Sequence, residues 1–195
     1  MAFTVYTVGH STRPIEEFLT LLHAFGIELL VDIRTIAKSR RNPQYGQEAL
    51  EASLQGGGIA YRRLEGLGGL RPARKDSVNQ AWRNRSFRGY ADHMQTAAFA
   101  ESLSELIRLA RERRTAIMCA EAVPWRCHRS LVGDALLVRG IAVEDIMTEK
   151  SSRPHALTPF AKVEGLTITY PSPTAGEETG RETARPARDA RTDSV

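Results

Sequence analysis

The chain has 195 residues, of which 42% are hydrophobic and 26% are charged, and its formal net charge is +4 at pH 7. This length is sufficient for one domain with a sizeable core. No apolar run approaches the roughly 20 residues that span a bilayer, and residues 1–8 do not resemble a signal peptide, so we expect a cytoplasmic protein without a membrane partner. In that compartment the two cysteines are expected to be reduced thiols rather than a disulfide.

The N-terminal part predicts a strand–helix–strand unit. An apolar run at Thr4–Val8 predicts a strand, and apolar residues at helical spacing predict a helix from Pro14 to Phe25, where Gly26 ends it. The continuous apolar run Leu29–Ile33 is typical of a central strand that is covered on both faces. Elements in this order indicate a βαβ unit with a parallel pair of strands.

The middle of the chain combines short elements with irregular segments. Residues 35–46 are irregular and basic, 47–55 predict a short helix, and 59–64 predict a third strand. Residues 67–85 predict a long loop, and loops of that length in a compact domain are usually functional or mobile. The chain contains no glycine-rich phosphate-binding motif.

The following stretch predicts further helices and strands in alternation. The predicted helices cover residues 87–97 and 99–114, and the next strand covers Ala116–Ala120. A helix that ends at Gly140 and a strand at 141–147 follow. Together the elements predict an α/β fold, with an open, mostly parallel sheet of about five strands and helices on both faces.

The C-terminal part of the sequence predicts a boundary between the domain and a tail. Residues 167–170 are predicted to add an edge piece to the sheet. From Pro171 onward there is almost nothing apolar to bury. We therefore expect a single domain over residues 1–170 and a disordered tail over 171–195.

Basic residues are concentrated in the segment 34–88. It contains twelve Lys or Arg against four acidic residues, interleaved with Tyr45, Tyr61, Trp82 and Phe87. This mixture suits an anionic small molecule or a nucleic acid as the partner. The alternative is that the charges are solvated on the surface of an arginine-rich protein.

Polar and reactive residues follow three of the predicted strands. Ligands of an open parallel sheet bind beyond the carboxyl ends of its strands. The residues at these ends are His10, Ser11, Asp32, Arg34, Cys119 and Glu121. The segment Cys127–Arg129 begins the helix after the fourth strand and therefore lies on the same edge. We expect one site at this edge, and it contains both cysteines.

Cys127 is the better candidate for a reactive thiol. It lies near a helix N-terminus and is flanked by Arg126, His128 and Arg129, which favour the thiolate. Cys119 either shares a reactive or ligating role or only packs in its strand.

Glu121 and several basic residues complete the candidate site. Glu121 is either a general acid or base, or the ion-pair partner of Arg126 or Arg129. The candidate anion-binding residues are Arg34, Arg40, Arg126 and Arg129. The candidate supporting residues are His10, Ser11, Asp32 and Tyr61. We expect Asp32 to orient an arginine, and His10 and His128 can each serve as a base or a ligand.

The spacing around the cysteines excludes two known motifs. Only two residues separate Glu121 from Pro124 and the cysteine pair after the proline is missing, so the zinc deaminase signature is absent. Trp125 stands where a phosphatase-like C-x5-R loop needs an arginine. The permissible metal ligands are Cys119, Cys127, His128 and His10. Because C-x7-C is not a recognised zinc pattern, we assign no metal to these residues, and the sequence leaves the cofactor unknown.

A set of short stretches runs through the chain. They are Thr7–Ser11, Val31–Arg34 with Ser39-Arg40, Gly58–Tyr61, Leu67–Gly69, Phe87–Ala91, and Met118–Glu121 with Cys127–Arg129. Together they resemble the domain-of-unknown-function family numbered 488. The resemblance implies a compact α/β domain with a site built from the Cys-Glu, Cys-His-Arg and Asp-Arg elements, and it implies no activity. Asp145 departs from the family pattern, which has a histidine in the last strand.

We therefore expect an enzyme that acts on a phosphate-bearing substrate, either a nucleotide or a nucleic acid. Arg34, Arg40 and Arg129 bind the anion in this hypothesis, and a cysteine and Glu121 are the reactive groups. One alternative is a non-catalytic nucleic-acid-binding module, consistent with the association of such proteins with DNA repair. Another is a metal-binding protein.

Overall fold

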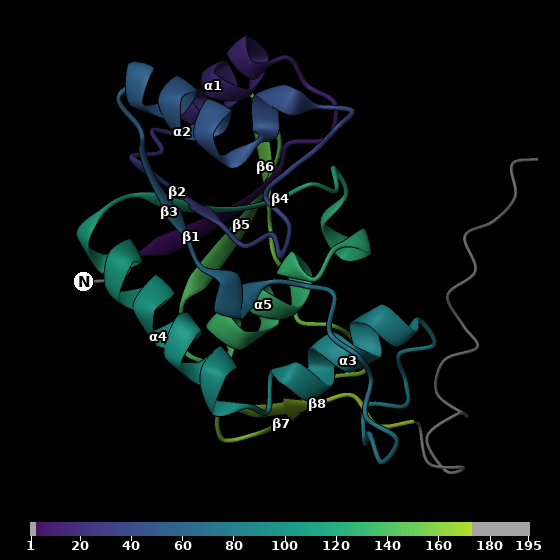
Figure 1. Ribbon diagram of the computed structural model, residues 1–195. Coiled ribbons are helices and arrows are strands. Elements are labelled where there is room, and N and C mark those ends of the chain that lie inside the picture. Colours follow the sequence, from purple (N-terminus) through teal and green to yellow (C-terminus); the bar gives the residue numbers. More distant parts are fainter. Residues whose placement is uncertain (1–2, 173–195) are drawn as a thin grey trace, which may run out of the picture.

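The fold has three layers, with helices on either side of a central sheet (Figure 1). The computed structural model describes residues 3–172, so the predicted tail lies outside the described residues except for 171 and 172. The helices and strands are β1 (Thr4–Gly9), α1 (Ile15–Ala24), β2 (Leu29–Asp32), α2 (Gln47–Gly56), β3 (Ala60–Arg63), α3 (Arg85–His93), α4 (Ala97–Glu112), β4 (Thr115–Cys119), α5 (Arg129–Leu137), β5 (Ala142–Thr148), β6 (Ser151–Pro154), β7 (Lys162–Glu164) and β8 (Thr167–Thr169). Within the described residues, no helix has the length and apolar character needed to cross a membrane.

Six strands form one open sheet in the order β3-β2-β4-β1-β5-β6. The first five strands of that order are parallel, and β6 is antiparallel to β5. The predicted α/β fold with an open, mostly parallel sheet is confirmed, with one strand more than expected. The additional strand, β6, has the sequence Ser-Ser-Arg-Pro and is largely exposed at the edge, so it lacks the apolar residues that predict a strand.

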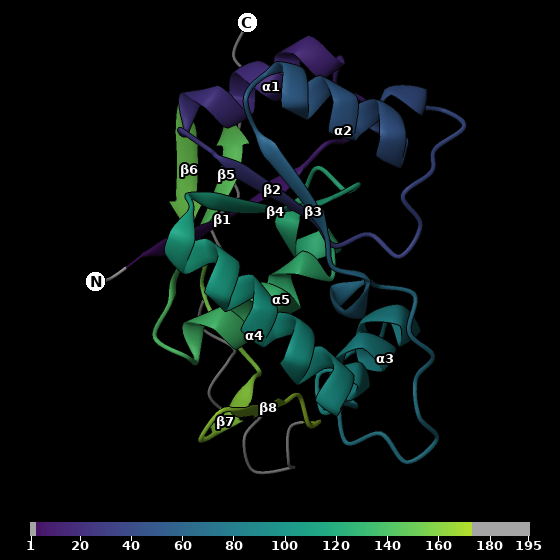
Figure 2. The ribbon, with the colours of Figure 1, turned by 60° about the vertical axis from the view of Figure 1, so that its left-hand side comes forward.

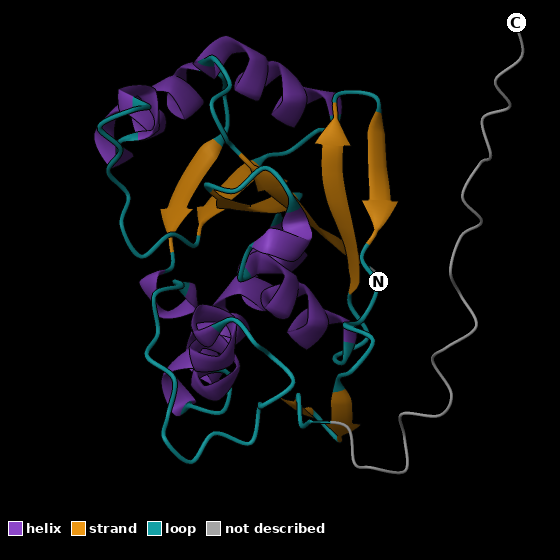
Figure 3. Ribbon diagram, turned by 90° about the vertical axis from the view of Figure 1, so that its right-hand side faces the viewer, coloured by secondary structure: helices purple, strands orange, loops and turns teal. Residues whose placement is uncertain are grey.

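Helices cover both faces of the sheet (Figure 2 and Figure 3). α1 and α2 lie on one face, where Tyr6 and Val8 of β1 share a core with Phe18. α4 and α5 lie on the other face with α3 beside them, where Val5 of β1 shares a second core with Leu103. β1 contributes to both cores because successive side chains of a strand point to opposite faces. β2 and β4 are buried along their whole length, which explains their continuous apolar runs.

Two predicted elements differ from the structure. The helix predicted over 87–97 corresponds to α3, which begins earlier because Asn84 caps it by accepting a hydrogen bond from the Ser86 N–H. It also ends earlier, because the Thr96 side chain caps the start of α4. The edge piece predicted at 167–170 is wrong: β8 pairs with β7 in a separate two-stranded sheet and does not extend the main sheet.

One carboxylate anchors the long loop that precedes α3. Asp92 is buried in α3 and accepts hydrogen bonds from the Arg74 backbone N–H (2.8 Å), the Ser77 hydroxyl (2.5 Å) and the Asn79 side-chain amide (2.8 Å). Asn79 in turn accepts a hydrogen bond from the backbone N–H of Tyr170 (2.9 Å). This bond holds the end of β8 beside the loop, which is why β8 does not reach the edge of the main sheet.

A buried charged network joins α5 to β1 and β5. His155 lies between Asp134 of α5 and Asp145 of β5, and each of its ring nitrogens is 3.1 Å from a carboxylate oxygen. Asp145 also accepts a hydrogen bond from Thr7 (2.5 Å), and Asp134 accepts one from Tyr170 (2.8 Å). Burial opposes a charge on His155, but the hydrogen bonds and charges of the two carboxylates outweigh it and raise its pKa to about 9. Asp145, which stands where a histidine was expected, is therefore the partner of a charged histidine from another position.

Candidate functional site

The candidate site lies where the chain leaves β1, β2 and β4 in the middle of the sheet. β1 and β4 are neighbours, yet the chain passes from β1 to α1 on one face and from β4 to α5 on the other. A crevice is expected at such a change of direction. The His10 N–H donates to the Cys119 carbonyl (3.0 Å), and the Ile33 N–H donates to the Met118 carbonyl (3.1 Å). These bonds hold the ends of three strands side by side.

Two thiols and one imidazole meet at this edge and form what we call the thiol–imidazole cluster: Cys119, Cys127 and His128. The Sγ atoms of Cys119 and Cys127 lie 3.8 and 3.7 Å from Nδ1 of His128. The other ring nitrogen, Nε2, lies 3.0 Å from the carbonyl oxygen of Ile33, so Nε2 carries a hydrogen and donates it. In the neutral imidazole Nδ1 is then unprotonated, and its lone pair faces both sulfur atoms.

The two thiols are buried, free and different in acidity. The hydrogen bond between them raises the pKa of Cys119, and burial raises it further. The same bond lowers the pKa of Cys127 in spite of its burial, and the positive charge of Arg129 lowers it further. Cys127 is therefore the thiol that ionises first.

The cluster lines a pocket with two adjoining lobes. The thiol lobe has a volume of about 370 Å³ and is lined by the cluster together with Leu70, Phe87 and Tyr90. The polar lobe has a volume of about 500 Å³. Its polar lining includes His10, Ser11, Thr12, Lys38, Ser39 and Asn42. The residues shared by both lobes are Arg34, Ile36, Ala120, Glu121 and Arg126.

Asp32 orients Arg34 in the wall of the pocket. The Arg34 guanidinium donates to the Asp32 carboxylate from Nε (2.9 Å) and from Nη2 (2.6 Å). The Tyr61 hydroxyl donates to the same carboxylate (2.9 Å). Nη1 of Arg34 donates to the Tyr45 carbonyl (2.9 Å). Since most of its donors are engaged, Arg34 contributes a fixed positive charge to the pocket rather than a mobile anion-binding side chain.

His10 supports Arg34 and lies outside the thiol–imidazole cluster. Its ring stacks on Tyr45 with the ring centroids 4.0 Å apart, and Nδ1 donates to the Ser11 carbonyl (2.8 Å). Burial lowers the pKa of His10 to about 4, so Nε2 is unprotonated and accepts a hydrogen bond from Arg34 (3.4 Å). Ser11 lines the polar lobe with a φ of 52°, which is uncommon for a residue other than glycine and is found most often at functional sites.

Arg129 holds the loop after β4 and does not line the pocket. Its side chain is fully buried and donates hydrogen bonds to the backbone carbonyls of Glu121 and Ala122. The loop thereby comes so close to β1 that a Cβ atom added at Gly9 would lie 1.8 Å from the Glu121 carbonyl oxygen. Arg129, predicted from the sequence as an anion-binding residue, is placed by the structure as a positioning residue for the loop.

Glu121 and Arg126 remain available to a ligand. Both are exposed and line both lobes, and neither side chain forms a hydrogen bond or an ion pair with any residue of the described range 3–172. The structure thus forms neither ion pair that the sequence suggested for Glu121. Arg40 is exposed and lines neither lobe, and Lys38, two residues earlier, lines the polar lobe in its place.

A family model places these features in a wider group of proteins. The model of the domain of unknown function DUF488 matches residues 14–136, which include α1, α5 up to its last residue but one and the whole thiol–imidazole cluster. The chain belongs to this family. The resemblance stated from the sequence motifs is thereby confirmed. Comparison with curated proteins and with solved structures gives no match.

Sequence reasoning missed two parts of this DUF488 site. Tyr90 of α3 donates from its hydroxyl to the Leu67 carbonyl (2.7 Å), and its ring centroid lies 4.9 Å from that of His128. Gly69 passes so close to the imidazole that an added Cβ would lie 3.0 Å from Nδ1. Both residues belong to stretches that carry the family resemblance, which was the available signal. The positions of Tyr90 and Gly69 beside His128 depend on packing between distant parts of the chain, which a local sequence pattern does not show.

The basic segment of the DUF488 domain is partly neutralised. Six of its twelve basic residues bind acidic side chains or backbone carbonyls, namely Arg34, Arg62, Arg63, Arg71, Arg74 and Arg88. Of its aromatic residues, Tyr45 is fully buried, whereas Tyr61, Trp82 and Phe87 are half-buried, and Trp82 packs against Phe87 and Phe160. The Tyr45 ring is therefore unavailable for stacking on nucleic-acid bases.

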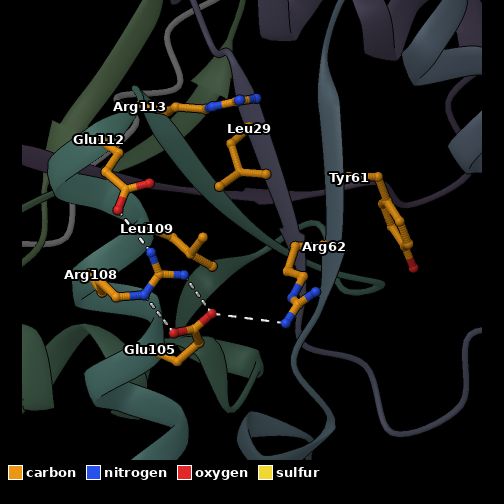
Figure 4. A pocket seen from close by; sticks show the side chains of 8 residues that line it. All are labelled: Leu29, Tyr61, Arg62, Glu105, Arg108, Leu109, Glu112 and Arg113. Atoms are coloured by element: carbon orange, nitrogen blue, oxygen red, sulfur yellow. Dashed lines mark hydrogen bonds and ion pairs between the residues drawn. The ribbon is translucent and has the colours of Figure 1, made fainter.

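A separate pocket between β2, β3 and α4 is lined by charges that pair with one another (Figure 4). Glu105 accepts a hydrogen bond from Arg108 (2.9 Å) and lies 3.9 Å from Arg62, and Arg108 also binds Glu112 (2.7 Å). Tyr61 points away from these groups. Since all its charged groups except Arg113 pair with one another, this pocket is a weaker candidate for a ligand than the one at the strand ends.

Proposed function

We propose that this DUF488 domain is an enzyme that acts on a small phosphate-bearing substrate such as a nucleotide. The phosphate binds in the polar lobe, and the bond that reacts lies in the thiol lobe. One observation carries the proposal. Two cations without a partner in the described part of the chain, and a cluster of two thiols and an imidazole, line adjoining lobes of one pocket.

The polar lobe offers groups that suit phosphate. Arg126 and Lys38 supply positive charge, and an arginine can bind two phosphate oxygens at once. Ser11, Ser39 and Asn42 line the same lobe with hydroxyl and amide groups. The lobe volumes of about 370 and 500 Å³ lie within the range of roughly 300–1,000 Å³ that is usual for small-molecule sites.

The thiol lobe offers groups that can react. The lone pair of His128 Nδ1 faces both sulfurs, an arrangement that serves either an activated thiol or a bound metal ion. Glu121 stands between the lobes without an ion pair to Arg126 or Arg129, which leaves its carboxylate available as a general base. Reduced thiols of this kind suit the cytoplasm.

A small substrate is favoured over a long nucleic acid. Tyr45 of the basic segment is fully buried, Trp82 packs against Phe87 and Phe160, and half of the segment's cations are engaged by protein groups. A nucleic-acid-binding module needs exposed cations along a strand and rings that stack on bases. Among the cations without a partner in residues 3–172, Arg126 and Lys38 line the same pocket.

Binding of phosphate ligands tests the first half of the proposal. Isothermal titration of the full chain with inorganic phosphate, AMP and ATP should show binding that Arg126→Gln weakens about tenfold to hundredfold, because a charge-assisted hydrogen bond contributes about 1.5–3 kcal/mol. Arg111→Gln, an exposed arginine of α4 outside the pocket, is the matched control and should leave affinity unchanged. Equal affinities in both variants contradict the proposed phosphate site.

Turnover tests the second half. A screen of phosphate esters and nucleotides that reveals an activity should find it reduced at least hundredfold in Glu121→Gln and in His128→Gln. Phosphate binding should survive in both variants, since neither residue is assigned to the phosphate. An activity that persists in both variants removes the reactive roles and leaves only the binding site.

A further inference from the structure

We propose that the thiol–imidazole cluster is a binding site for a divalent metal ion of the zinc class, with one coordination position open to the thiol lobe. The site belongs to the same pocket as the proposed function, but the inference concerns the binding of metal alone and needs no substrate. It rests on the geometry of three side chains: Cys119, Cys127 and His128.

The distances within the cluster fit the ligands of one ion. Both sulfurs lie 3.7–3.8 Å from Nδ1 of His128. In a tetrahedral site with zinc–sulfur bonds of about 2.3 Å and zinc–nitrogen bonds of about 2.0–2.1 Å, a sulfur and a nitrogen ligand are about 3.6 Å apart. The three ligand atoms lie within 4.8 Å of one another, so a small contraction completes the set.

The chemistry of the ligands selects the metal. Two thiolates and an imidazole are the soft and intermediate ligands that zinc accepts, and they disfavour magnesium and calcium, which prefer oxygen. Two thiolates also neutralise a divalent charge in a site where both cysteines are buried.

The surroundings of His128 are those of a metal-binding histidine. Its Nε2–H donates to the Ile33 carbonyl (3.0 Å), which fixes the ring and aims Nδ1 at the sulfurs. The Tyr90 ring packs beside the imidazole, and the Gly69 backbone passes next to Nδ1. The ring is therefore held in place before a metal arrives.

Three protein ligands leave a fourth position for water or substrate. Structural zinc sites usually have four protein ligands, and catalytic ones usually have three. All three members of the cluster line the thiol lobe, which also contains Glu121 and Arg126, so the open position faces the pocket. His10 does not supply the fourth ligand, because it stacks on Tyr45 and binds Ser11.

The fold explains why spacing in the sequence did not reveal this set. Cys119 ends β4, and Cys127 and His128 precede α5 after a turn that includes residues 124–126. The ligands therefore come from a strand end and a helix start, whereas the recognised zinc patterns bring two close pairs together. The C-x7-C spacing is the length of the loop that Arg129 holds in place.

Metal analysis of the full chain tests the inference directly. The protein is stripped with a chelator under reducing conditions, titrated with Zn²⁺ or Co²⁺ and freed of excess metal. We expect one ion per chain by elemental analysis, and a sulfur-to-cobalt charge-transfer absorption. Cys119→Ser, Cys127→Ser and His128→Gln should each lower the affinity at least tenfold, whereas His23→Gln, an exposed histidine of α1, should not. Circular dichroism verifies that each variant is folded.

A glycine substitution probes the site without removing a ligand. Gly69→Ala places a methyl group 3.0 Å from Nδ1 and should weaken metal binding, whereas Gly56→Ala meets nothing within 4 Å and should not. Absence of stoichiometric metal in the wild type, or equal metal binding by the wild type and the Cys119→Ser/Cys127→Ser double variant, overturns the inference. Phosphate binding measured on the stripped protein is independent of this result, so failure of the metal site and failure of the phosphate site are distinguishable.

Discussion

At the level of single residues, Arg126 and Arg129 differ in what their guanidinium groups contact. Arg126 is exposed at the pocket and has no partner within residues 3–172, whereas Arg129 is buried against two backbone carbonyls. A sequence shows only that both are arginines beside Cys127. Which one turns inward depends on the path of the loop over Gly9, and that path is a tertiary feature.

Replacing Arg129 should therefore cost stability, and replacing Arg126 should not. Arg129→Met removes two charge-assisted hydrogen bonds from a fully buried guanidinium to the carbonyls of Glu121 and Ala122, which should lower the free energy of unfolding by about 2–4 kcal/mol. Arg126→Met, at an exposed position, should change it by less than about 0.5 kcal/mol. Urea denaturation followed by circular dichroism measures both, and equal losses contradict the positioning role.

His10 should make the protein less stable in acid. Its pKa falls from 6.5 to about 4 on folding, so between these values the unfolded chain binds a proton that the folded chain does not. The free energy of unfolding should decrease as the pH falls from 6.5 to 4, and the decrease should be smaller in His10→Gln. Denaturation at several pH values gives the free energy of unfolding of the wild type and of His10→Gln. If the two curves run parallel between pH 4 and 6.5, His10 does not contribute to the pH dependence.

At the level of elements, apolar periodicity predicted the five parallel strands and the helices that cover them. Apolar periodicity did not predict the elements whose ends or pairing are set by polar side chains or by residues far away in the chain. Thr96 divides two helices by capping the second, and Asn79 draws the end of β8 away from the main sheet. β6 pairs with β5 although its sequence carries no apolar pattern. These helix ends and strand pairings depend on hydrogen bonds, which leave no repeating pattern in the sequence.

The network around His155 should make stability depend on alkaline pH. The pKa of His155 rises from 6.5 in the unfolded chain to about 9 in the fold, so its contribution is fully present below pH 6.5 and is lost as the pH rises through 9. A rise of this size corresponds to about 3 kcal/mol. His155→Gln should flatten the profile of unfolding free energy between pH 6.5 and 9, whereas His23→Gln should keep it. A wild-type profile that is already flat refutes the charged network.

At the level of the whole molecule, the pocket is assembled from segments that lie far apart in the chain. The rule that ligands bind at the carboxyl ends of parallel strands predicted the edge and brought His10, Asp32 and Cys119 together from sequence alone. It could not predict the division into two lobes, the contribution of Tyr90, or the burial of Arg129. Those features depend on how α3 and the loops pack.

Ligand binding should therefore protect distant segments at the same time. Phosphate in the polar lobe should slow amide hydrogen exchange in residues 10–12, 36–39 and 120–126, because all three segments line that lobe. Residues 105–112 of α4 should exchange at an unchanged rate. Hydrogen exchange with mass spectrometry, with and without ligand, measures each segment, and protection confined to one of the three contradicts a shared pocket.

Because β4 lies between β1 and β2, the sheet cannot form around these strands until β4 has been synthesised. β1 and β2 leave the ribosome first, but they form no backbone ladder with each other and must wait for a strand made some eighty residues later. Both cysteine thiols are made with or just after that strand. The nascent chain therefore contains no thiol while the gap between β1 and β2 is still open. This order shortens the time during which oxidants can reach a thiol.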